Sequence, residues 1–247
     1  MKPILLLIPP ALALLTLLRL VWRDIRARNM QIWLGSYIGR KRRPAVAGPT
    51  HVMFCFVDHF EPMHGKVDLA TQRARVDRWT EGWRALAGRH RDADGRPPQH
   101  GFFYPEEEYL PEHLDKLSAL CRDGFGEIEV HLHHDNDTEA NFRRTIAGFC
   151  EVLHRDHGAL SRHPQTGQLM FGFIHGNWCL DNSNPDGRWC GLDNELILLR
   201  ELGCYADFTM PSAPSPTQTH IINSIYYATD DPDRPKSHDT GVRVRVG

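Results

Sequence analysis

Three histidines and two aspartates lie within the seven residues HLHHDND at positions 131–137. The preceding residues, 128–132, alternate between apolar and polar side chains, which is typical of a β-strand. Because alternate side chains of a strand share a face, His131 and His133 are expected to point the same way, with Asp135 in the turn that follows. Imidazoles and carboxylates gathered at a strand end predict a divalent metal site. The other interpretation is a polar strand end that carries surface histidines.

Ionisable residues also follow three other apolar runs. The run VMFCFV ends in Asp58, His59 and Glu61, and the run LMFGFI ends in His175. A shorter run, CYADF, carries Asp207 near its end. In α/β proteins the carboxyl ends of parallel strands form the edge at which ligands bind and chemistry takes place. We therefore expect these side chains to converge with the histidines.

The residues that we expect to converge at these strand ends include His59, Glu61, His131, His133 and Asp135 as candidate metal ligands. This mixture of nitrogen and oxygen ligands suits Zn²⁺ best, with Co²⁺, Mn²⁺ and Fe²⁺ as alternatives. A bound metal ion polarises a carbonyl group and activates water, and a carboxylate outside the ligand set can accept the proton of that water. The sequence thus predicts metal-assisted hydrolysis of an amide or ester.

Segments typical of strands and helices alternate from residue 51 to residue 208, which predicts an α/β fold with a parallel sheet or barrel. The strand over 52–57 is continuously apolar, so it is expected to be fully buried. The glutamates at 106–108 are interpreted as a solvated helix start, favoured by the helix dipole. Helices are predicted over residues 71–87, 111–121, 139–154 and 192–202.

Composition narrows the possible functions. The chain has 247 residues, 15 histidines and a formal net charge of −2, so its charge gives no argument for binding nucleic acid. The six cysteines form no CxxC pair, which argues against a zinc ribbon. The expected division of the chain is an anchor over residues 1–22, a basic linker over 23–50 and an α/β barrel domain over 51–247.

The anchor is predicted from residues 3–22, which are almost wholly apolar and contain Arg19 as their one charged side chain. This length suffices for a single transmembrane helix. A signal peptide is the alternative, but no small-residue cleavage site follows the apolar run. Basic residues gather after the run, so the positive-inside rule places the domain on the cytoplasmic side of a bacterial inner membrane, with a periplasmic location left open.

The segments FCFVDHFEP, EIEVHLHHD, FIHGNW and ELGCYADFTMPS, in this order, resemble the motifs of the polysaccharide deacetylase (NodB-like) family. The resemblance covers residues 52–211. It implies an α/β fold of the distorted (β/α)7 barrel type, either complete or cut short at the C-terminus. It also implies metal-dependent removal of N- or O-acetyl groups from a polysaccharide or a lipid-linked sugar.

The resemblance also implies roles for single residues. Asp58 falls where the family has its catalytic base, and His59 falls where the family has a metal-binding Asp. His175 replaces an Arg of the family and, like Asp207, is assigned to catalysis. The residues assigned to the substrate pocket are Asn177 and Trp178.

The family's late histidine, which acts as general acid, has no clear counterpart, and His220 and His238 are the candidates. Two further hypotheses therefore stand beside the deacetylase. One is a catalytically inactive barrel that binds glycan or serves as a scaffold at the membrane. The other is a metal-dependent hydrolase of a different amide.

Overall fold

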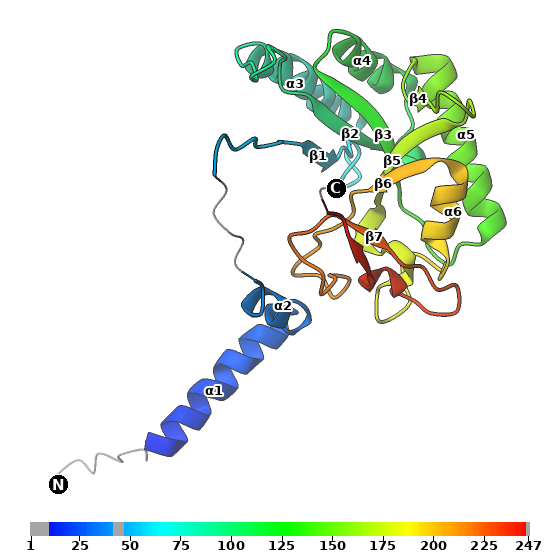
Figure 1. The fold of residues 1–247 in the computed structure, drawn as a ribbon. Helices are drawn as coiled ribbons and strands as arrows, with labels where there is room; N and C mark the ends of the chain where they lie inside the picture. Colours follow the sequence, from blue (N-terminus) through cyan, green and yellow to red (C-terminus); the bar gives the residue numbers. More distant parts are fainter. Residues whose placement is uncertain (1–9, 42–46, 246–247) are drawn as a thin grey trace.

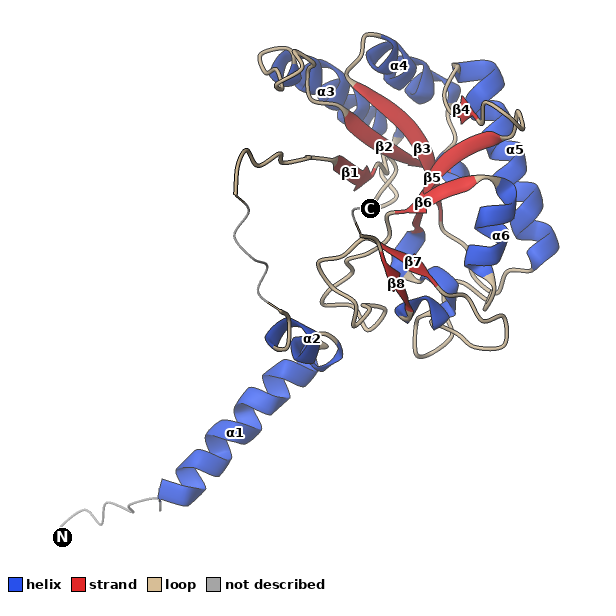
Figure 2. Ribbon diagram, in the orientation of Figure 1, coloured by secondary structure: helices blue, strands red, loops and turns tan. Residues whose placement is uncertain are grey.

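The computed structural model describes residues 10–41 and 47–245 of the chain. Its centre is a six-stranded sheet in which β1, β2, β3, β5 and β6 run parallel in that spatial order (Figure 1). The short β4 pairs antiparallel with β5, and β7 and β8 form a separate hairpin (Figure 2). The strands are β1 Phe56–His59, β2 His100–Pro105, β3 Gly126–Leu132, β4 Ser161–Arg162, β5 Leu169–His175, β6 Cys204–Asp207, β7 Tyr226–Ala228 and β8 Gly241–Arg243.

Helices connect the parallel strands, and their ends follow local capping rules. Asp68 caps the start of α3 by accepting from the Thr71 N–H, and Thr138 caps α5 in the same way. Gly203 ends α6 with a φ of 105°, as expected for a residue in the left-handed region. The α-helices are α1 Pro10–Ala27, α2 Leu34–Ile38, α3 Leu69–Ala87, α4 Pro111–Arg122, α5 Glu139–His157 and α6 Glu195–Leu202. The 3₁₀-helices are η1 Met30–Ile32, η2 Glu106–Glu108, η3 Gly176–Trp178, η4 Leu180–Asn182 and η5 Ser237–Asp239.

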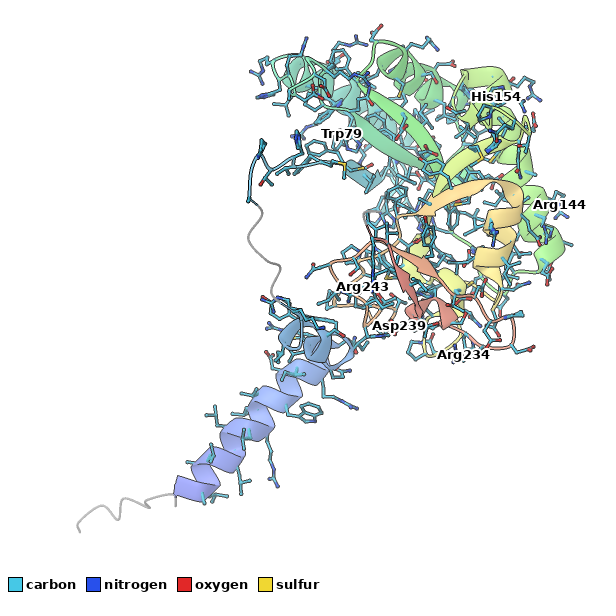
Figure 3. All side chains as sticks on the ribbon, in the orientation of Figure 1. Trp79, Arg144, His154, Arg234, Asp239 and Arg243 are labelled. Carbon is cyan, nitrogen blue, oxygen red and sulfur yellow. The ribbon has the colours of Figure 1, made fainter. Side chains whose placement is uncertain are left out.

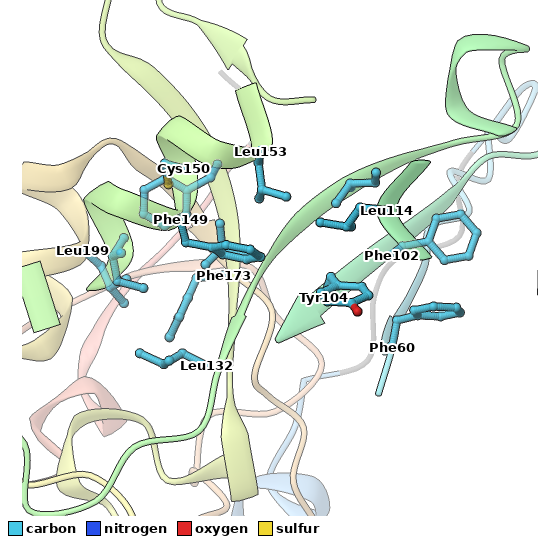
Figure 4. Packing of buried hydrophobic residues seen from close by; sticks show 14 of the residues in the cluster. Phe60, Phe102, Tyr104, Leu114, Leu132, Phe149, Cys150, Leu153, Phe173 and Leu199 are labelled. Atoms are coloured by element: carbon cyan, nitrogen blue, oxygen red, sulfur yellow. The ribbon is translucent and has the colours of Figure 1, made fainter. Parts of the chain in front are cut away.

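The two faces of the sheet differ in chemistry. One face packs against the helices, and Figure 4 shows Phe102 and Tyr104 of β2 beside Leu114 of α4. The opposite face carries the polar residues of β3, because successive side chains of a strand alternate. There the buried Glu129 accepts from the Gly172 N–H of β5 at 2.5 Å. This alternation puts His131 on the polar face.

The prediction of an α/β fold with a mostly parallel sheet is confirmed. The prediction that residues 52–57 form a fully buried strand was wrong: β1 begins at Phe56, and Val52, Met53 and Phe54 are exposed. The reason is that β1 lies at an edge of the sheet and pairs with β2 alone among the described strands. Among the described residues, β1 and β6, the outer strands of the parallel set, do not pair with each other. The closed barrel therefore stays a prediction.

The transmembrane helix expected over residues 3–22 falls partly on residues 1–9, which lie outside the described residues. The remainder of this segment is in α1. Among the residues that the structure describes, no helix is long and apolar enough to cross a membrane.

Candidate functional site

Three imidazoles surround one carboxylate at the carboxyl ends of β1 and β3. Oε1 of Glu61 lies 3.4 Å from Nδ1 of His59, 3.3 Å from Nε2 of His131 and 3.7 Å from Nε2 of His133. We call these four residues the Glu61 cluster. The parallel register explains why these residues meet. His59 of β1 pairs with Phe103 of β2, and Phe103 pairs with Glu129 of β3. His131 follows Glu129 by two residues on the same face of β3.

The ring orientations in the Glu61 cluster suit metal binding. Nδ1 of His131 donates to the carbonyl oxygen of Ile174 at 2.6 Å, and Nδ1 of His133 bonds to Glu107. Because a carbonyl or carboxylate oxygen can only accept, each Nδ1 carries a proton, so a ring in its neutral form turns an Nε2 lone pair towards Glu61. Two such lone pairs and a carboxylate can share a cation, so the donor set fits a divalent metal ion.

The pKa shifts of His131 and Glu61 agree with this arrangement, whereas for His133 the effect of burial is outweighed by the hydrogen bond to Glu107 and the nearby carboxylates, which raise its pKa. Burial lowers the pKa of His131, despite the opposing effect of Glu61, and so favours the neutral ring. Burial alone would raise the pKa of Glu61, but the polar contacts with His131 and His59 and the nearby charges outweigh it and hold that pKa below its usual range. Glu61 therefore stays ionised, as a metal ligand must be.

The loop after β5 fits closely against the Glu61 cluster. A Cβ atom on Gly176 would lie 2.3 Å from Cδ2 of His133, so only glycine leaves room for this ring. The ring of Trp178 lies 5.8 Å from that of His59 and is 44% exposed. Asn177 and Trp178 have φ values of 55° and 57°, a conformation that bulky side chains rarely adopt. The backbone thus holds an exposed indole at the rim of the cluster.

Asp58, assigned as catalytic base, lies on the other face of β1 from His59. Its Oδ2 is 3.7 Å from Nε2 of His100, and burial, with a contribution from Glu61, raises its pKa to about 7. Asp58, His59 and Glu61 nevertheless line one cavity of about 590 Å³ between the end of β1 and α3. Figure 3 labels Trp79 of α3, which also lines this cavity.

Asp135 and Asn177 take no part in the contacts of the Glu61 cluster. Asp135 Oδ1 instead accepts a hydrogen bond from the Trp189 N–H at 2.6 Å. Asn177 contributes its carbonyl oxygen to a contact with Cys179. The structure therefore brings together four of the five predicted metal ligands, and the fifth holds a neighbouring loop.

His175 belongs to a second group of side chains on the helix-facing side of the sheet. Oε1 of Glu195 lies 3.1 Å from Nε2 of His134 and 3.5 Å from Nε2 of His175, and Oε2 lies 3.4 Å from Sγ of Cys190. We call these four residues the Glu195 cluster. His175 and Glu195 are 0% exposed, so this group is sealed from solvent.

Sequence reasoning missed Glu107, Cys190 and Glu195. The glutamates at 106–108 form the 3₁₀-helix η2 and Glu107 is exposed, but they also make contacts that a solvated helix start does not include: Glu107 bonds to His133, and Glu108 accepts from the Met63 N–H at 2.6 Å. Their position after β2 was the available signal, since polar residues at a strand end had pointed to the other ligands. Glu195 gave no local signal, because it lies in the first turn of a helix 61 residues from His134.

Asp207, assigned to catalysis, is held by Thr209 at the end of β6, whose N–H and hydroxyl donate to it at 3.0 and 2.8 Å. Burial raises the pKa of Asp207 from 3.8 to about 7, although these hydrogen bonds oppose the rise. A carboxyl whose folded pKa is raised binds a proton more tightly in the folded state, so its contribution to stability is present below pH 3.8 and is lost as the pH rises through about 7.

We therefore expect Asp207→Asn to gain stability over the parent as the pH rises. Between about pH 5 and pH 7.5 the free energy of unfolding of the variant, relative to the parent, should increase by about 2 kcal/mol. Urea unfolding of both proteins at the two pH values measures this difference. A difference that is the same at both pH values would contradict the raised pKa.

Comparisons with known proteins found no match: no family model matches the chain, and neither a curated protein nor a solved structure is significantly similar to it. The likeness to polysaccharide deacetylases therefore rests on the sequence motifs. The geometry of the two clusters is the ground on which a function can be argued.

Proposed function

We propose that the Glu61 cluster binds one divalent metal ion, zinc in the first place, and that the protein is a hydrolase that removes acetyl or other acyl groups from a carbohydrate. The observation that carries the proposal is the approach of three imidazole nitrogens to one oxygen of Glu61. The side chains of His59 and His133 are 26% and 29% exposed, whereas that of His131 is 0% exposed. A site with one buried ligand and two partly exposed ligands is open to solvent on one side, which is typical of catalytic metal sites.

Each residue has a separate task in this proposal. The ion, when bound, supplies Lewis acidity that polarises the acyl carbonyl. Ile174 and Glu107 hold the rings of His131 and His133 through Nδ1, which directs their Nε2 atoms to the ion. Asp58 would accept and return a proton, because its Oδ1 has no hydrogen-bond partner among the described residues and it borders the cavity that His59 and Glu61 also line.

The rim of the cluster supports a carbohydrate as the substrate. Trp178 presents an exposed indole beside His59, and polar ligands lie directly behind it. A sugar ring has an apolar face and a hydroxyl edge, which suit an aromatic surface next to polar groups. The parallel sheet would then be one wall of the barrel that the motif resemblance implies, with a polysaccharide or a lipid-linked sugar as substrate.

The test is acetate release from N-acetylated amino-sugar oligomers by the metal-loaded chain. We expect Asp58→Asn to lower kcat by about 10²- to 10⁴-fold, the usual contribution of a general base, and to keep its bound metal. Asp94→Asn, an exposed aspartate in the loop after α3, is the matched control and should behave as the parent.

Two results would overturn parts of the proposal. An Asp58→Asn variant with full activity would show that another residue takes the proton. A metal-loaded chain that binds glycan but releases no acyl group would favour the catalytically inactive alternative.

A further inference from the structure

We propose that the Glu195 cluster is a second metal site, which holds a structural zinc ion and is separate from the catalytic metal proposed above. Its ligands come from four distant parts of the fold: His134 from the turn after β3, His175 from the end of β5, Cys190 from the following loop and Glu195 from the first turn of α6. The inference goes beyond the proposed hydrolase, because it concerns a different set of residues.

The distances fit a tetrahedral ion. One ligand atom from each of the four residues lies within 4.8 Å of all the others. With Zn–N bonds near 2.0 Å and Zn–S bonds near 2.3 Å, neighbouring ligand atoms of a tetrahedral site are roughly 3.3–3.8 Å apart. Oε1 of Glu195 lies 3.1 and 3.5 Å from Nε2 of His134 and His175, close to this range, and Sγ of Cys190 lies 3.4 Å from the other carboxylate oxygen, Oε2.

The hydrogen bonds of His175 leave its metal-facing nitrogen free. Nδ1 of His175 donates to the carbonyl oxygen of Gly176 at 2.5 Å, so its Nε2 carries a lone pair. This buried Nε2 has no hydrogen-bond partner among the described residues, although it faces Oε1 of Glu195. Nδ1 of His134 lies 3.2 Å from Oδ2 of Asp137 without forming a hydrogen bond, and its Nε2 faces Oε1 of Glu195 at 3.1 Å. A cation explains why a lone pair and a carboxylate oxygen face each other in the core.

Burial indicates a structural ion. His175, Cys190 and Glu195 are all fully buried, and the side chain of His134 is almost so. Four protein ligands closed off from solvent are typical of structural zinc, whereas catalytic zinc keeps an open position. The Glu195 cluster thus differs from the Glu61 cluster both in exposure and in having a cysteine.

The loop between His175 and Glu195 contains several residues other than glycine with a positive φ, which is a strained backbone conformation. Such strained conformations persist only where the surrounding structure fixes them from several sides. An ion bound by residues before, within and after the loop would fix it in this way. The loop residues other than glycine that have a positive φ are Asn177, Trp178, Asp181, Asn182 and Trp189, with values of 55°, 57°, 53°, 49° and 69°.

Cobalt substitution tests the proposal with a readout that the Glu61 cluster cannot give. A thiolate bound to Co²⁺ has a charge-transfer absorption band in the near ultraviolet, and Cys190 is the one cysteine in either cluster. After removal of metal with a chelator and addition of Co²⁺, the full-length chain should show this band. We expect His131→Ala to retain it and Cys190→Ser to lose it together with one equivalent of metal.

Cys150→Ser is the matched control, because Cys150 is also buried but belongs to neither cluster, and it should keep the band. Absence of the band from the cobalt-saturated parent would overturn the inference, whether or not the Cys190→Ser variant folds. A band that persists in Cys190→Ser would do the same. A parent that shows the band but binds only one metal ion would support the structural site and count against the catalytic one.

Discussion

Replacement of His131 by alanine is expected to lower kcat/KM by at least about 100-fold and to remove one equivalent of metal. His131 is the fully buried member of the proposed metal site, held by Ile174 and directed at Glu61 from 3.3 Å. Loss of a residue that only supports a ligand already costs 10- to 100-fold in metal affinity or activity. Loss of the ligand itself should cost at least the upper end of this range.

The matched control is His113→Ala. His113 is likewise a buried histidine, in α4, and its Nδ1 lies 3.3 Å from the hydroxyl of Tyr104. Both variants lose a buried imidazole, but His113→Ala should keep both metal equivalents and its activity. Elemental analysis and acetate release measure the two effects. A His131→Ala variant that binds as much metal as His113→Ala would show that the Glu61 cluster is a hydrogen-bonded group without a metal ion.

Short-range patterns were enough to predict part of the site. The alternation of residues 128–132 placed His131 and His133 on one face, and the structure directs both rings at Glu61. The same rule separates Asp58 from His59, because neighbours in a strand point to opposite faces. The motif resemblance had grouped these two residues in one site, and in the structure they meet only through the cavity that both line.

The parts that could not be predicted depend on contacts between distant segments. The apolar run at 52–57 is typical of a buried strand, but its burial depends on how many neighbours β1 has. Cys190 resembles any isolated cysteine in the sequence, and Glu195 resembles an ordinary residue of a first helical turn. Only the packing of α6 beside the ends of β3 and β5 gives these two residues a common environment.

The second large effect is expected for stability, in Glu195→Gln. This change keeps the volume of the side chain and an oxygen that can accept from the Asp181 N–H, a bond of 2.7 Å. It removes the charge that His134 and His175 face in the core. Because breaking a buried charge pair leaves its partners uncompensated, the free energy of unfolding should fall by about 3 kcal/mol, which corresponds to a decrease in Tm of roughly 6–12 °C.

Glu201→Gln, in the same helix, is the matched control, since Glu201 is exposed and pairs with Arg143 at the surface. Its loss should lower stability by less than about 1 kcal/mol. A chelator then separates a metal site from a hydrogen-bonded network. If the Glu195 cluster holds an ion, chelation should destabilise the parent and Glu201→Gln by more than it destabilises Glu195→Gln, which keeps only the Glu61 site. If Glu195→Gln is less stable but loses as much stability to the chelator as the parent does, the carboxylate stabilises the core through its hydrogen bonds and charge alone.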